Sequence, residues 1–387
     1  MRGWGKSVSI ICVAAALYVG LCPAAVSADL GVVYAFKGGA DGGQPASVIR
    51  DAAGSLYGTT MQGGANDRGT VFVIAPDGTE RRIRSWPGRD RRGLIPTARL
   101  ALDSHGNLYG MTPAGGRYGY GTVFKVTPDG QLTTLHSFDG VDGGYPETGV
   151  TIDSHDNLYG VTTGVFNYGT IFEIQPILTS SHGHKFKVLH TFSNLDNGAY
   201  PSGALILDAK GNLYGKTHQG GEFGGGVIFQ LATNGTITVL HSFQGSGGEH
   251  PAGSLTMDSQ GNMYGTTIQG GLSDYGTVFR LTPEGGFTVL YSFAGGTDGQ
   301  YPSGNLIRDE SGNLYGTTYQ GGYRLLGEVF KVSPEGSMSI VHAFTGGSDG
   351  YSPGPDLASD GASLFGTASQ GGEHHSGLIF SIPLSAP

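Results

Sequence analysis

Residues 312–322 read "GNLYGTTYQGG", and near-copies of this stretch recur along the whole chain. Three of them are "GNLYGMTPAGG" at 106–116, "GNLYGKTHQGG" at 211–221 and "GNMYGTTIQGG" at 261–271. The aromatic residue of the motif returns every 50 to 55 residues, at Tyr57, Tyr109, Tyr159, Tyr214, Tyr264, Tyr315 and Phe365. Fixed periods of this length are typical of repeat architectures such as propellers. The sequence therefore predicts seven copies of one structural unit.

Each copy contains four short segments in which apolar and polar residues alternate. In the sixth copy, between residues 302 and 344, they are "PSGNLIRD", "GNLYGTT", "GEVFKVSP" and "MSIVHAF". A period of two, bounded by Gly, Pro or Asp, predicts β-strands. The turn signals "D-x-x-G-N" and "TP-x-G" separate the first strand from the second and the third from the fourth. We therefore expect an all-β fold, a seven-bladed β-propeller of four-stranded blades.

The two ends of the repeat region complement each other. Residues 31–36, "GVVYAF", are a copy of a fourth strand, whereas residues 377–383, "GLIFSIP", are a copy of a third strand. The N-terminal strand would thus complete the last blade and close the ring. We expect residues 29–387 to form a single propeller domain.

Residues 1–28 have the pattern of a secretory signal peptide. Arg2 and Lys6 precede an apolar run that ends in Val26-Ser27-Ala28. An uncleaved membrane anchor is the alternative. Both cysteines lie in this segment, so the mature chain would have no disulfide and no thiol chemistry. We expect the mature protein to be secreted, either extracellular or periplasmic.

Charge and hydropathy argue against a nucleic-acid partner and against a membrane span. Without the two basic residues of the leader, the formal charge of the chain falls from −9 to −11. An acidic secreted chain argues against nucleic acid as a partner. No later run of about 18 apolar residues appears, so the mature chain has no predicted membrane span. We expect a monomer.

Recurring aromatic residues predict the core. Every copy supplies the "LYG" aromatic residue, the phenylalanine of "GTVF", and an aromatic residue at the end of the "LHSF" strand. Burial of such side chains contributes roughly 1.5–3 kcal/mol each before entropy costs. Because they recur in all seven copies, we expect them to pack sheet against sheet, rather than to bind ligand.

These motifs also resemble a known family. The pattern "GNLYGTT-x-QGG…YGTVF…LTP-x-G…T-V-L-(H/Y)-SF" resembles the Gloeobacter–Verrucomicrobia tandem repeat of secreted bacterial proteins, the GloVer choice-of-anchor repeat. The resemblance covers nearly all of the mature chain and implies export, but no established activity and no catalytic residues. More loosely, the second and third strands are similar to those of kelch blades, which supports the fold alone.

The longer loops indicate where a ligand would bind. The two short turns fall on one face of a propeller, and the "QGG" and blade-junction loops fall on the other, where binding residues are expected. Aromatic residues gather in these loops and suit sugars or protein partners. The alternative is that they only pack the loops. The ligand-binding candidates are Tyr118, Tyr120, Tyr168, Phe223, Tyr275 and Tyr323.

Acidic residues recur in the same loops. "FDGVDGG" at 138–144 carries Asp139 and Asp142, whose carboxylates could bind Ca²⁺ together with backbone oxygens. The alternative is an ordinary Asp-Gly turn, which needs no cofactor.

Two copies depart from the repeat in residues that can carry chemistry. "KTHQGGEFGG" introduces Lys216, His218 and Glu222, and "QGGEHHSG" introduces His374 and His375. Such a set could perform acid–base catalysis or bind a metal, although loop histidines are usually only solvated. The basic stretch 81–96 could bind an anionic polymer or be a solvated outer strand. No metalloprotease, P-loop or dinucleotide motif is present.

Three functional hypotheses follow. The first is a secreted, non-catalytic propeller that binds a glycan or an extracellular protein through the face with the long loops. The second is a polysaccharide lyase or hydrolase with a site on the same face. The third is a purely structural surface protein.

Overall fold

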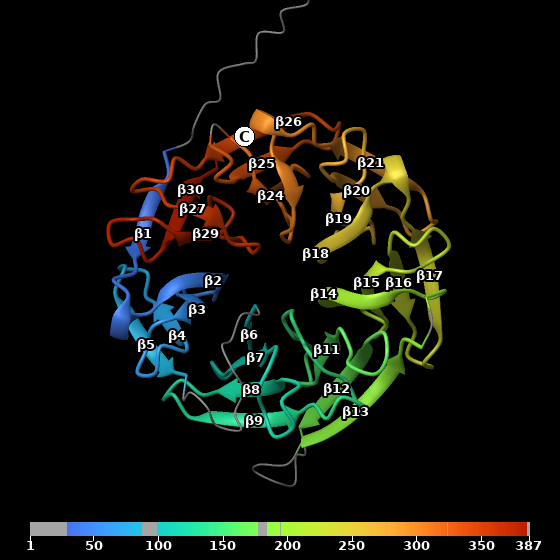
Figure 1. Ribbon diagram of the computed structural model, residues 1–387, viewed down its shortest axis with the longest axis horizontal. Helices are drawn as coiled ribbons and strands as arrows, with labels where there is room; N and C mark the ends of the chain where they lie inside the picture. The colour runs from blue at the N-terminus through green and yellow to red at the C-terminus, as the bar shows by residue number, and fades with distance from the viewer. Residues whose placement is uncertain (1–28, 87–98, 177–183, 194, 323, 385–387) are drawn as a thin grey trace, which may run out of the picture.

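The computed structural model describes residues 29–86, 99–176, 184–193, 195–322 and 324–384. They form seven antiparallel β-sheets arranged radially in a ring, so the predicted seven-bladed propeller is confirmed (Figure 1). The chain passes around the ring blade by blade, and each blade has its first strand nearest the axis. Among the described residues no helix is long and apolar enough to cross a membrane.

The strands of each blade follow the four segments seen in the sequence. Blade 1 contains β2 (Gly43–Arg50), β3 (Leu56–Gln62), β4 (Thr70–Ile74) and β5 (Glu80–Ser85). Blade 2 contains β6 (Ala101–Leu102), β7 (Leu108–Thr112), β8 (Thr122–Val126) and β9 (Leu132–Ser137). Blade 3 contains β10 (Thr151–Ile152), β11 (Leu158–Thr162), β12 (Thr170–Pro176) and β13 (His184–Thr191). Blade 4 contains β14 (Ala199–Leu207), β15 (Leu213–Gln219), β16 (Val227–Leu231) and β17 (Ile237–Ser242).

The remaining blades have the same order. Blade 5 contains β18 (Glu249–Met257), β19 (Met263–Gln269), β20 (Thr277–Leu281) and β21 (Phe287–Ser292). In blade 6 the inner strand is split into β22 (Gln300–Pro302) and β23 (Ile307–Arg308), followed by β24 (Leu314–Gln320), β25 (Glu328–Val332) and β26 (Met338–Ala343). Blade 7 contains β27 (Tyr351–Pro353), β28 (Ala358–Ser359), β29 (Ser363–Gln370) and β30 (Leu378–Pro383). Short 3₁₀ turns precede three inner strands, at Gly39–Asp41, Gly245–Gly247 and Gly296–Asp298.

The N-terminal strand closes the ring. β1 (Gly31–Ala35) pairs antiparallel with β30, with Gly31 opposite Ser381 and Ala35 opposite Leu378. Blade 7 thereby gains its outer strand from the other end of the chain, as the two terminal sequences predict. Because β1 pairs with β30, the outer edge of β30 is not left as an unpaired strand edge.

The "D-x-x-G-N" turn explains why the repeat conserves its tyrosine in copy after copy. In blade 5, Asp258 Oδ1 accepts the backbone N–H of Asn262 at 2.9 Å, and Oδ2 accepts Asn262 Nδ2 at 2.9 Å and the Tyr264 hydroxyl at 3.0 Å. Burial alone would raise the pKa of Asp258, but these hydrogen bonds hold it below its usual range. The same asparagine and tyrosine bonds occur at Asp103, Asp153, Asp208 and Asp309. The third copy has Asp156 in place of the turn glycine, and its φ of 61° confirms the predicted left-handed residue.

We expect Asp258→Ala to lower the free energy of unfolding by roughly 2–4 kcal/mol, because it leaves several partly buried donors without an acceptor. Urea denaturation at pH 7 measures the change. The loss should shrink as the pH falls through the pKa of Asp258, because stabilisation by an ionised carboxylate is present above that pKa and is lost below it. Ser259→Ala, an exposed change at the next residue, is the control and should leave stability unchanged.

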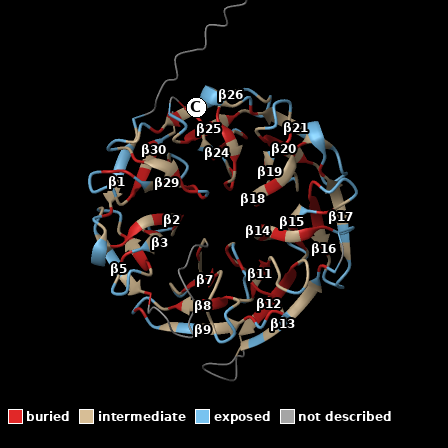
Figure 2. Cartoon of the chain, in the orientation of Figure 1, coloured by how far each residue is buried: buried red, intermediate tan, exposed pale blue. Residues whose placement is uncertain are grey.

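The core lies between neighbouring sheets, as the buried residues in Figure 2 show. Phe243 ends blade 4 and packs edge-to-face on Phe279 of blade 5, with ring centroids 5.2 Å apart. Equivalent contacts join Phe192 to Phe229 and Trp86 to Phe124. The glycine of "LYG" makes room for this ring, since a Cβ on Gly265 would lie 2.7 Å from Phe279. The repeated aromatic residues are therefore core, as predicted.

At the junctions between blades, a residue in the left-handed backbone conformation forms a hydrogen bond to the blade before it. Tyr145, Tyr200, His250 and Tyr301 each precede a proline and have φ between 53° and 57°. Their backbone N–H groups bond to the loop of the previous blade, as in Tyr200 N to Tyr168 O at 2.7 Å. This geometry directs the junction side chains toward the loops of the neighbouring blade.

Candidate functional site: the long-loop face and the axial pocket

The antiparallel order of the strands gives the propeller two different faces. One carries the short turns. The other, here called the long-loop face, carries the loops between the second and third strands and the junctions between blades. Its second-to-third-strand loops are residues 63–69, 113–121, 163–169, 220–226, 270–276, 321–327 and 371–377.

Exposed apolar side chains concentrate on the long-loop face. Ten large apolar residues are exposed among the described part of the chain, and nine of them lie in these loops, in the junctions or at the strand ends beside them. Only Val32 lies elsewhere, on the outer strand β1. The nine are Tyr118, Val141, Tyr145, Phe166, Leu195, Phe223, Leu272, Tyr319 and Leu325.

The predicted ligand-binding aromatic residues divide into two groups. Tyr118 and Phe223 are exposed, at 50% and 48%. Tyr120, Tyr168 and Tyr275 are half-buried, and each packs edge-to-face on a junction tyrosine, with centroids 5.9 Å apart in every case. Tyr323 lies outside the described residues.

Tyr319 adds an exposed ring to this face that was not among the binding candidates, and Phe166, an aromatic residue of the same loops, adds another. Tyr319 is 57% exposed at the end of β24, and Phe166 is 72% exposed in the loop of blade 3. The sequence carried a signal for Tyr319. This tyrosine occupies the variable position of "TT-x-QGG", and the preceding copy has Ile268 at the same position.

The acidic residues of the junctions serve the loops themselves. Asp142 Oδ2 lies 2.7 Å from His136 Nε2, and its Oδ1 accepts the backbone N–H of Asp139 at 3.0 Å. Asp139 in turn accepts the backbone N–H groups of Val141 and Asp142. Within the described ranges there is no group of three or more His, Cys, Asp or Glu side chains that could hold a metal. These contacts therefore lend the calcium hypothesis for Asp139 and Asp142 no support, and it stays a prediction.

The structure brings together only part of the catalytic candidate set. Glu222 is exposed in the loop of blade 4, and His374 and His375 are exposed in the loop of blade 7, with blades 5 and 6 between them. Lys216 and His218, by contrast, lie on the same face of β15, toward blade 5. Catalysis by these residues stays a prediction.

Lys216 and His218 are both electrostatically perturbed. Lys216 is 1% exposed, its Nζ donates to the carbonyl of Ala252, and burial lowers its pKa to about 7. The His218 ring stacks on His250 with centroids 4.6 Å apart. Burial lowers the pKa of His218, and the charges of His250 and Lys216 lower it further. Lys216 is therefore close to half protonated at pH 7, and His218 is shifted toward its neutral form.

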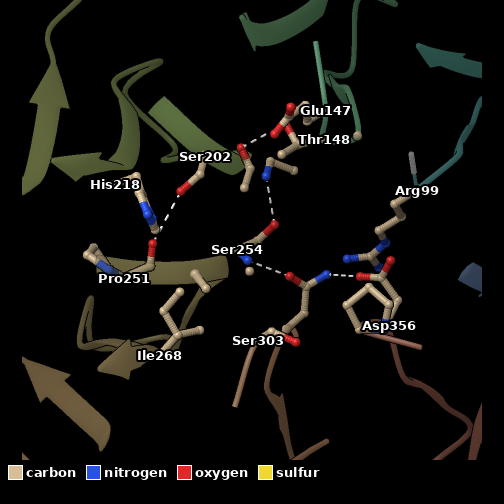
Figure 3. Close-up of a pocket in the computed structure, with 17 residues that line it drawn as sticks. Arg99, Glu147, Thr148, Ser202, His218, Pro251, Ser254, Ile268, Ser303 and Asp356 are labelled. Carbon is tan, nitrogen blue, oxygen red and sulfur yellow. Dashed lines mark hydrogen bonds between the residues drawn. The ribbon is translucent and has the colours of Figure 1, made fainter. Parts of the chain in front are cut away.

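An axial pocket lies beside His218, where the inner strands converge (Figure 3). It has a volume of about 250 Å³ and is lined from the inner strands of blades 4 to 7 and by residues that precede β6 and β10. His218 and Ile268 lie at the ends of β15 and β19 next to the long-loop face, so the pocket occupies the half of the channel nearer that face.

A chain of hydrogen bonds crosses four blades along the pocket wall. Ala204 N donates to Ser254 Oγ at 2.7 Å, Ser254 N donates to Asn305 Oδ1 at 2.5 Å, and Asn305 Nδ2 donates to Asp356 Oδ1. The Arg99 guanidinium lies beside the Asp356 carboxyl in Figure 3. Burial raises the pKa of Asp356, and Arg99 and Asn305 oppose that shift.

Sequence reasoning did not find these pocket residues, although a signal was present. Each inner strand places one residue four positions before its turn aspartate, or before Asp360 in the last copy. This position ranges from glycine to arginine, while the residue after it is always Leu or Val. The seven residues are Ser47, Arg99, Gly149, Ala204, Ser254, Asn305 and Asp356.

The fold and its repeats define a tandem-repeat β-propeller. Comparison with family models then identifies the repeat. The Gloeobacter/Verrucomicrobia repeat matches residues 23–193 and 164–380, and the chain belongs to this family. The resemblance seen in the sequence is thereby confirmed. No curated protein matches the chain.

Solved structures share the fold at low sequence identity. A puromycin hydrolase is 13% identical with a TM-score of 0.57, and the match covers 85% of this chain and 50% of that one. An aldose sugar dehydrogenase from Streptomyces coelicolor in its PQQ-bound form is 14% identical with a TM-score of 0.48, covering 93% and 99% of the two chains. A gluconolactonase from Xanthomonas campestris is 14% identical with a TM-score of 0.46, covering 92% and 90%. At a TM-score of 0.57 the puromycin hydrolase shares the fold, and an identity of 13% says nothing of the activity of this chain.

Proposed function

We propose that this protein is a secreted, non-catalytic recognition protein that binds extracellular glycan chains through its long-loop face. The observation that carries the proposal is that, of the ten large apolar side chains exposed in the described ranges, nine lie on that face. Exposed apolar groups gathered on one side of a soluble protein usually mark an interaction surface. The predicted leader at residues 1–28 supports an extracellular or periplasmic location.

The spacing of the rings favours glycan over protein. Among the described residues, Phe223 and Tyr319 contact no other aromatic ring, and Tyr118 lies under the guanidinium of Arg117. These three rings belong to blades 4, 6 and 2 and are spread around the face, whereas a smaller cluster of Phe166, Tyr120 and Tyr145 is confined to the junction of blades 2 and 3. A protein partner usually requires a contiguous buried centre. Separate rings, each with an apolar face, suit successive sugar units of an extended chain.

We expect Phe223→Ala and Tyr118→Ala each to weaken glycan binding about 3–10-fold, since one aromatic contact contributes roughly 0.5–1.5 kcal/mol. A glycan and polysaccharide array, probed with the purified protein in Ca²⁺ and again in EDTA, selects the ligand. Titration calorimetry then measures the affinity of each variant. Loss of binding in EDTA would revive the calcium hypothesis for the acidic loops.

The control is Val32→Ala, because Val32 is the one large exposed apolar residue of the described chain that lies away from the long-loop face. This variant should bind as the native protein does. Equal affinity in both aromatic variants, with native melting temperatures, would contradict the site assignment. Cleavage of a bound polysaccharide would instead favour the lyase or hydrolase alternative.

A further inference from the structure

We propose that the axial pocket is a second binding site that accepts a single neutral sugar unit or a similarly sized polyol. The proposal is independent of the long-loop face. It rests on the composition of the ring of axial residues, on the hydrogen-bond chain that fixes them, and on the balance of charge around the pocket.

The pocket wall is polar where the fold does not require it. Three of the axial positions hold Ser254, Asn305 and Asp356, which are at most 9% exposed. The equivalent positions in blades 3 and 4 are Gly149 and Ala204, so the repeat tolerates small side chains there. Burying polar groups costs free energy unless each is hydrogen-bonded. Ser254, Asn305 and Asp356 meet this requirement through their hydrogen-bond chain, so the protein keeps a polar wall at positions where the repeat also accepts Gly and Ala.

The hydrogen-bond chain fixes the orientation of the two groups that would contact a ligand. Asn305 Oδ1 accepts from Ser254 N, so its amide nitrogen faces Asp356. The Asn305 backbone is held in addition by a bond from its N–H to Pro355 O at 2.8 Å. A site whose side chains are already ordered loses less entropy when a ligand binds.

The donors and acceptors match vicinal hydroxyl groups. A carboxylate accepts from hydroxyls, a guanidinium donates to them, and an asparagine amide does both. Asp356 and Arg99 lie together on the pocket wall, as Figure 3 shows, and Ile268 and Pro251 supply apolar surface opposite the polar chain. A pocket of about 250 Å³ has room for one sugar ring.

The charges favour a neutral ligand. Arg99 offsets Asp356, and Glu147 adds a negative charge at the pocket rim. His218 is held toward its neutral form by burial and by the charges of His250 and Lys216. An anionic sugar would be repelled by Glu147, and a cationic sugar would compete with Arg99 for Asp356.

The test is saturation-transfer NMR and calorimetry of the full protein with glucose, galactose, mannose, glucuronate and glucosamine. We expect at least one neutral sugar to bind, and to bind at least tenfold more tightly than glucuronate and glucosamine. Asp356→Asn, which keeps the acceptor of the Asn305 bond but removes the charge, should weaken binding at least tenfold. Asp77→Asn, the same change in an exposed turn, should have no effect.

A second variant separates binding from folding. Ala204→Leu adds volume at an axial position and should abolish sugar binding while the melting temperature stays within a few degrees of native. Val32→Ala, on the outer strand β1, should leave monosaccharide binding unchanged. If no sugar of the panel binds up to 50 mM (roughly the weakest affinity that would be meaningful), or if neither pocket variant changes binding, the proposal is overturned, whatever the glycan array shows.

Discussion

Glu328→Thr is expected to stabilise the protein by roughly 2–5 kcal/mol above pH 8, which corresponds to a rise of about 3–7 °C in melting temperature. Glu328 begins β25 and is 1% exposed, and its Oε2 has no hydrogen-bond partner. Burial raises the pKa of this carboxyl to about 8, and the charge of Asp298 contributes to the shift. A buried carboxylate without a partner is destabilising whenever it is ionised.

Four other blades show which residue begins the third strand where no buried carboxylate is present. There a threonine begins the third strand, and its Oγ1 lies 2.8–2.9 Å from the Oγ1 of a second-strand threonine, as between Thr267 and Thr277. In blade 6 the second-strand residue is still Thr318, but its Oγ1 has no partner. Threonine at position 328 would restore the pair.

The pH dependence identifies the cause of the gain. An unfolded glutamate loses its proton near pH 4.5, whereas Glu328 in the folded protein keeps its proton up to about pH 8. Between these values the folded state binds more protons, so the native protein loses stability as the pH rises. The benefit of Glu328→Thr should accordingly grow from pH 5 to pH 8 and then level off. Thermal denaturation across that range measures it.

Two further variants separate charge from packing. Glu328→Gln removes the charge but keeps the shape, and should reproduce most of the gain at pH 9 and little of it at pH 5. Glu310→Thr makes the same replacement at an exposed position of the same blade and should change nothing. A melting temperature for Glu328→Thr that lies below native at pH 9 would show that the carboxylate has a partner in solution, such as a bound cation.

The parts of the fold that repeat could be predicted from the sequence. The turn aspartate, the "LYG" tyrosine and the paired aromatic residues are local patterns written several times over, so chance resemblance is excluded by their number. The complement between residues 31–36 and 377–383 predicted ring closure because a third-strand copy at one end needs a fourth strand from elsewhere.

The parts that depend on convergence of distant segments could not be predicted. Arg99 and Asp356 are 257 positions apart and meet only because the ring closes. Within the loops, Tyr118 and Tyr120 look alike in sequence, yet Tyr120 is half-buried because the left-handed φ of Tyr145 brings a second ring against it. Glu328 occupies an alternating strand position like any other, and only the packing of the loops around it makes it costly.

Lys216→Met is expected to stabilise the protein by roughly 2–5 kcal/mol at pH 6. Lys216 is buried between blades 4 and 5, where burial lowers its pKa from 10.5 to about 7. Blade 2 has Met111 at the same position of the repeat, fully buried, so the fold accepts a methionine of similar length. The Ala252 carbonyl that accepts from Lys216 also accepts from Thr266 Oγ1 at 3.4 Å, so it is not left without a donor.

The gain should fall as the pH rises, opposite to the behaviour expected at Glu328. Below pH 7 the lysine is protonated in both states and the folded protein bears the full cost of the buried charge. Between pH 7 and 10.5 the unfolded state binds more protons than the folded state, so the native protein gains stability and the variant loses its advantage. Lys210→Met, an exposed change in the turn of the same blade, is the control and should show no such trend.

Stability lower in Lys216→Met than in the native protein at pH 6 would contradict the argument and would mean that the bond to Ala252 outweighs the cost of burial. If the gain appears, and if glycan or sugar binding is lost at the same time, the buried amine is retained for function despite its cost. Because Lys216 and Glu328 lie in blades 4 and 6, their effects should add. A double variant should then exceed the native protein in stability at both pH 6 and pH 9 by more than either single change does.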